Sequence, residues 1–174
     1  MRIVLLVLGL ALSSVASHTA AADVRIFGDW TVDLSADKTT VYATTGSDVG
    51  SRLGEVCTLS DGHCTWSLVI DTPCEQSHSY HLVGNTNFGA ARLRLKCDER
   101  VDENSYRYLF TSSNDLEALL KGSGEVGFAV PMPNDDINVL RFSLAGESDA
   151  MSMAESYAIT HTVAGNQKGA TIRN

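Results

Sequence analysis

The chain has 174 residues, 44% of them hydrophobic, and a formal net charge of −8 at pH 7. This length suits one domain with a single hydrophobic core. Its 21 acidic residues outnumber its 13 basic ones, and an acidic surface repels phosphate backbones, so the composition argues against a nucleic-acid-binding protein.

The N-terminus predicts export. Arg2 supplies a positive charge, residues 3–16 form an apolar run, and Ala20-Ala21-Ala22 precede Asp23. This order fits a secretory signal peptide with a small-residue cleavage site. The apolar run is shorter than the about 20 residues that a membrane-spanning helix needs, so a membrane anchor is disfavoured.

We therefore expect three parts in the chain. Residues 1–22 are a cleaved signal peptide, residues 23–160 are a single β-rich domain, and residues 161–174 are a flexible C-terminal tail. Removing the signal peptide removes one base and no acid, so 12 bases face 21 acids and the net charge becomes −9. The mature protein is expected to be periplasmic or secreted, with no transmembrane segment.

The four cysteines of an exported chain are expected to form two disulfides. Cys57 and Cys64 flank residues 59–62, which suit a hairpin loop and would place the two cysteines opposite each other. Cys64 with Cys74 fits poorly, because an extended strand after Cys64 leads roughly 20 Å away and leaves few residues for the return. We favour Cys57–Cys64 with Cys74–Cys97, and the alternative is Cys57–Cys74 with Cys64–Cys97.

Alternating apolar and polar residues between glycine- and proline-marked turns predict a succession of short strands. In the first, Trp30, Val32 and Leu34 would share one face, with Trp30 in the core. The predicted strands cover residues 27–34, 39–44, 52–59, 64–70, 79–83, 90–96, 106–110, 126–130 and 137–144.

Two segments have helical features. Asn114 and Glu117 resemble a helix cap and its partner at the third helical position, before a short helix that stops at Gly122. Residues 147–158 carry small and apolar residues at helical spacing. Together these elements predict a mainly β protein, an antiparallel β sandwich or barrel-like domain with two short helices and two disulfides.

One predicted strand carries three bases. Within residues 91–97 the apolar residues would face inward, and Arg92, Arg94 and Lys96 would lie on the opposite face. We interpret these bases as a solvated face that discourages pairing at a sheet edge.

Three histidines suggest an alternative function. His78 and His81 have H-x-x-H spacing, and His63 adjoins a cysteine. On a strand, however, residues three apart face opposite ways, and a C-x₂-C zinc pattern and a G-x-S-x-G elbow are both missing from the sequence. We expect no catalytic residue, metal or cofactor. The alternative is a small periplasmic hydrolase or metal-dependent enzyme, which requires His63, His78 and His81 to converge.

Several motifs resemble the invasion-associated locus B family and related uncharacterised exported proteobacterial proteins. The signal peptide is followed by Gly28-Asp29-Trp30, paired cysteines, residues 127–131 (GFAVP), and residues 139–146 (VLRFSLAG) before a small-residue helix. The chain lacks the cysteine that the invasion proteins often carry just after this tryptophan. The resemblance implies an exported bacterial envelope protein of non-catalytic binding or structural type. It also implies an unknown envelope or cell-surface protein partner and a link to host-cell interaction.

Overall fold

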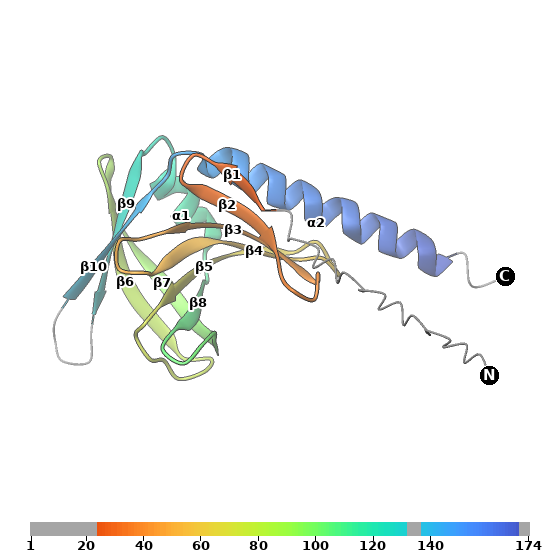
Figure 1. Cartoon of the computed structure of the whole chain (residues 1–174). Helices are drawn as coiled ribbons and strands as arrows, with labels where there is room; N and C mark the ends of the chain where they lie inside the picture. Colours follow the sequence, from red (N-terminus) through yellow and green to blue (C-terminus); the bar gives the residue numbers. More distant parts are fainter. Residues whose placement is uncertain (1–23, 132–136, 171–174) are drawn as a thin grey trace, which may run out of the picture.

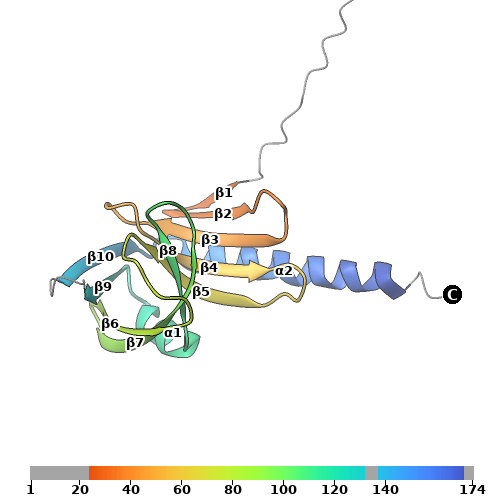
Figure 2. The ribbon, with the colours of Figure 1, turned by 90° about the horizontal axis from the view of Figure 1, so that it is seen from below.

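The computed structural model describes residues 24–131 and 137–170 (Figures 1 and 2). The predicted signal peptide lies outside the described residues. In chain order the elements are β1 (Arg25–Phe27), β2 (Trp30–Leu34), β3 (Thr40–Gly46), β4 (Arg52–Thr58), β5 (Cys64–Ile70), β6 (Ser79–Thr86), β7 (Gly89–Arg100), β8 (Tyr106–Phe110), α1 (Ser113–Leu120), β9 (Glu125–Pro131), β10 (Ile137–Ser143) and α2 (Glu147–Ala170).

All ten described strands belong to one antiparallel sheet, in the order β1-β2-β3-β4-β5-β8-β7-β6-β9-β10. The first five strands follow the sequence as a meander, and the remaining strands add in a different order. The predicted mainly β, antiparallel fold with two helices and two disulfides is confirmed. The single predicted strand at residues 27–34 is divided into β1 and β2 by a turn at Gly28, whose φ is +55°.

The sheet curls around its own core without closing into a barrel. Phe110 on β8 lies 5.8 Å from Phe128 on β9 between ring centroids, although two strands separate β8 from β9 in the sheet. Trp30 on β2 donates its indole N–H to the carbonyl of Ser143 on β10, at 3.0 Å. The two ends of the sheet therefore approach each other, but among the described residues no strand pairing joins β10 to β1 or β2.

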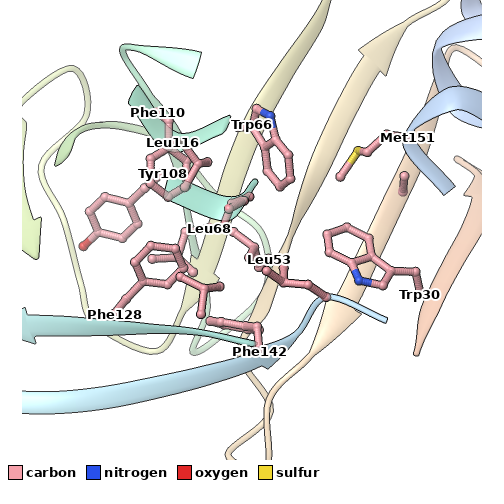
Figure 3. Close-up of a cluster of buried hydrophobic side chains, with 14 of the residues drawn as sticks. Trp30, Leu53, Trp66, Leu68, Tyr108, Phe110, Leu116, Phe128, Phe142 and Met151 are labelled. Atoms are coloured by element: carbon pink, nitrogen blue, oxygen red, sulfur yellow. The ribbon is translucent and has the colours of Figure 1, made fainter. Parts of the chain in front are cut away.

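The core occupies the inner face of this curled sheet (Figure 3). The inward residues are those that alternation predicted, because successive side chains of a strand point to opposite faces. Trp30 is fully buried and meets Trp66 edge to face, with ring centroids 6.2 Å apart. The largest fully buried side chains also include Leu53, Leu68, Leu116, Phe128, Leu140 and Phe142.

The helix α1 is as short as predicted, but its start differs. It begins at Ser113 after Ser112 in extended conformation, and the side chain of Ser112 makes no capping hydrogen bond. The predicted cap, Asn114, therefore lies inside the helix. Leu116 and Leu120 are buried from this helix, and α1 contacts β6 and β7.

The second helix is much longer than predicted. The structure extends α2 over 24 residues to Ala170, beyond the predicted end at residue 158 and into the predicted tail at 161–174. Ala150, Ala154 and Ala158 are fully buried, so their small side chains let α2 lie close to β1–β4, as Figure 1 shows. Thr162 then donates to the carbonyl of Leu59 at 3.1 Å, which ties a later turn of the helix to the β4–β5 hairpin.

Both disulfides have the pairing favoured from the sequence. Cys57 and Cys64 are directly opposite on β4 and β5, with Cα atoms 4.0 Å apart. Cys74, in the connection before β6, is bonded to Cys97 on β7 across a sequence separation of 23 residues. No cysteine in the described chain is free.

The two disulfides should contribute unequally to stability. A disulfide stabilises the fold mainly by lowering the conformational entropy of the unfolded chain, and it does so more when it closes a longer loop. On this basis the stabilisation is about 2.5 kcal/mol for Cys57–Cys64 and about 3.4 kcal/mol for Cys74–Cys97. We expect C74A/C97A to lower the free energy of unfolding more than C57A/C64A does, as measured by urea denaturation. Equal losses would show that loop length does not decide the effect here.

The turn between β1 and β2 is hydrogen-bonded to the turn between β10 and α2, although the two are far apart in the sequence. Asp29 donates its backbone N–H to the carbonyl of Ala145 at 2.9 Å, and Ser143 donates its hydroxyl to the Asp29 carboxylate at 2.6 Å. The Ser143 hydroxyl oxygen also accepts the backbone N–H of Ala145. We call Gly28, Asp29, Ser143, Ala145 and Gly146 the clasp. It joins two of the motifs that carried the family resemblance.

Candidate anion-binding surface

The histidines of the enzyme alternative do not converge. His63 lies beside Thr65 in the β4–β5 hairpin, with 3.1 Å between Nε2 and Oγ1. His78 pairs with Glu75 at 3.3 Å, and His81 lies on β6. Among the described residues, no group of three metal-ligating side chains within ligand distance includes any of these histidines.

One such group does exist, and it is structural. The ligating atoms of Glu55, Cys57 and Cys64 lie within 4.8 Å of one another. Both cysteines are oxidised to a disulfide, so neither presents the thiolate that a metal would need. Glu55 is buried on the inner face, where desolvation first, and then the negative charges of nearby glutamates, raise its pKa to about 7.

The outer face of β7 carries a row of three cations. Arg92, Arg94 and Lys96 are exposed and alternate with buried Leu93 and Leu95. Successive members of such a row are roughly 7 Å apart, because a strand rises by about 3.4 Å per residue. Within the described part of the chain, none of the three forms an ion pair or a side-chain hydrogen bond.

The structure overturns the proposed reason for these cations. They are solvated as predicted, but β7 is an interior strand that pairs with β6 on one side and β8 on the other. There is no edge at β7 for them to protect. Three unpaired cations side by side repel one another, and their positive potential can attract an anion.

Apolar side chains adjoin the cations on the same face. Val83 on β6 is directly opposite Arg92 of β7. On the other side of β6, Val83 is opposite Ala129 of β9, and Ala129 is opposite Val139 of β10. Val83 is 44% exposed and Val139 is 54% exposed. The cations and these valines make up what we call the β7 surface: Arg92, Arg94, Lys96, Val83 and Val139.

Sequence reasoning identified the cations but missed the valines beside them. The position of Val139 beside Val83 depends on β6 pairing with β9, and these two strands are too far apart in the chain to give a local signal.

Comparisons with known proteins agree with this fold. The structure is similar to the crystal structure of invasion associated protein B from Bartonella henselae, with a TM-score of 0.53 and 15% sequence identity, covering 76% of this chain and 96% of the other. At this identity the similarity concerns the fold alone, and at that level it supports the resemblance seen in the motifs. No protein-family model matches the chain, and a search of curated proteins found no match.

Neither helix of the described chain, α1 or α2, is both long enough and apolar enough to cross a membrane.

Proposed function

We propose that this is an exported, non-catalytic binding protein that contacts an acidic protein partner on a cell envelope or host-cell surface through the β7 surface. The row of Arg92, Arg94 and Lys96 carries this proposal, since these cations stand unpaired on an interior strand. Because the mature chain is expected to carry a net charge of −9, a cationic row on it would orient an acidic partner toward one face.

Export is supported by two observations. Disulfides are rare in reducing compartments and common outside the cytoplasm, and this chain has two of them. The predicted signal peptide would direct the chain to a secretion pathway. The fold it shares with a protein named as invasion associated favours a role at the boundary between a bacterium and its host.

The proposal predicts that neutralising two cations weakens binding. We expect R92Q/R94Q to bind cultured epithelial cells roughly 10-fold less tightly, since each lost charge contact costs about 0.5–1 kcal/mol at a solvent-exposed rim. The control K38Q/K121Q changes the net charge equally at two exposed positions that are not part of the β7 surface. Saturation binding of labelled protein, at low and high salt, provides the measurement.

The nature of the partner is tested on the same cells. Trypsin treatment should remove the saturable binding, and enzymatic removal of sulfated polysaccharides should leave it intact. The opposite pattern would assign the surface to an acidic polysaccharide. Binding no stronger than that of an inert acidic protein, or equal loss in both double variants, would contradict the proposal.

A further inference from the structure

The outer face of the other half of the sheet has a hollow. Figure 2 shows β2–β5 from this side, with α2 behind them. The hollow has a volume of about 250 Å³, and its floor and walls come from β2, β3, β4, β5 and β8 together with Val101, which follows β7. A cavity of about 150 Å³ can hold benzene, so this one has room for a substituted six-membered ring.

The floor of the hollow is backbone at Gly54, where no side chain fills the space. Gly54 on β4 lies between Thr44 on β3 and Ser67 on β5, and it leaves the floor without a side chain. A Cβ at this position would lie 2.0 Å from the carbonyl oxygen of Ala43, so β3 and β4 approach too closely for any other residue. The hydroxyl of Ser67 donates to the Gly54 carbonyl at 3.2 Å and is held at the floor.

One wall is fixed by ion pairs. Arg107 on β8 bonds both Asp98 and Glu99 of β7, each at 2.7 Å. The guanidinium is largely buried, and its two carboxylate partners satisfy its charge. This wall therefore offers little free charge to a ligand.

The remaining charged groups of the hollow are an acid and a base. Asp33 on β2 and Arg52 on β4 both line it. Within the described residues, neither side chain makes a hydrogen bond or an ion pair. Partial burial raises the pKa of Asp33, and the charge of Arg52 acts against that rise. A ligand that donates to the carboxylate would relieve this cost.

We infer that the hollow binds a neutral, polyhydroxylated ligand about the size of one sugar ring. A hydroxyl group can donate to Asp33 and accept from Arg52, whereas a purely anionic ligand would be repelled by the former and a cationic one by the latter. The ring of Tyr42 and the side chains of Val56 and Val69 offer apolar walls for the C–H face of such a ring. This inference is independent of the β7 surface.

The test is titration of the mature protein with neutral monosaccharides, namely glucose, galactose, mannose and N-acetylglucosamine, followed by ¹⁵N–¹H NMR. We expect saturable shifts at the amides of Tyr42, Thr44 and Ser67 for at least one sugar. D33A and R52Q should each weaken that binding by roughly 10-fold, since a hydrogen bond to a charged group contributes about 1.5 kcal/mol. D61N, which alters an exposed carboxylate in the β4–β5 hairpin, and R92Q/R94Q should bind like the wild type.

Several outcomes would overturn the inference. They are the absence of saturable shifts with all four sugars, tighter binding of glucuronate or glucosamine than of the neutral sugars, and unchanged binding in both D33A and R52Q. Both substitutions lie on the outer face, and the wild-type pattern of the remaining amide resonances would verify that each variant is folded.

Discussion

Replacing Gly146 by alanine should destabilise the protein by roughly 3–5 kcal/mol, which places it among the most damaging single substitutions. Gly146 has a φ of +91°, and a Cβ there would lie 1.9 Å from the carbonyl oxygen of Phe27. The strained backbone costs about 1–3 kcal/mol. The clash adds to this because the β1–β2 turn must move, and the hydrogen bonds of the clasp are lost with it.

Gly50 offers a matched control for this experiment. It also has a positive φ, +83°, but nothing lies within 4 Å of the position that its Cβ would take. G50A should therefore lose only the stability that the strained backbone costs, about 1–3 kcal/mol. Urea denaturation and thermal melting of both variants measure the difference. Similar losses would show that contact between the two turns contributes little.

The second large effect concerns the buried carboxyl of Glu55. In the folded protein its pKa is raised from 4.5 to about 7. Desolvation is the largest cause, and the negative charges of Glu155, Glu117 and Glu147 add to it. Between these two pKa values the unfolded chain has released the proton and the folded chain still holds it. Stability therefore falls as the pH rises through this interval, and the loss is complete above pH 7.

We expect E55Q to be more stable than the wild type at pH 8, by about 2–3 kcal/mol, because the neutral amide never ionises. At pH 4.5 and below the difference should nearly vanish. Stability curves from urea denaturation between pH 4 and 8 provide the measurement. E117Q is the control, since Glu117 is exposed and only one of the surrounding charges. A pH profile that E55Q leaves unchanged would contradict this assignment.

Local patterns in the sequence were enough to predict most elements and the disulfides. Strict alternation predicted the strands, because burial of one face leaves a signal at every second residue. The hairpin loop before Cys64 predicted which cysteine lies opposite Cys57, because a short loop fixes the register. Both predictions depend on neighbours in the chain.

Features that depend on distant neighbours were not predicted. The pairing of β6 with β9 places Val83 next to Ala129, and no residue near either strand indicates it. The length of α2 was missed because the chain after Ala158 is polar and contains glycines, whereas contacts such as that of Thr162 with the β4–β5 hairpin form only in the fold. The hollow over Gly54 likewise depends on residues from β2, β3, β4, β5 and β8, which come together only in the fold.

The clasp also constrains the order of events during biosynthesis. Its partners are separated by more than a hundred residues, Asp29 near the start of the described chain and Ala145 before the last helix. The first strands therefore cannot complete their contacts until nearly all of the chain has emerged, and contacts over such separations slow folding. Under the export proposed above, this delay would leave the chain incompletely folded while it passes through a membrane, with oxidation and final folding on the far side.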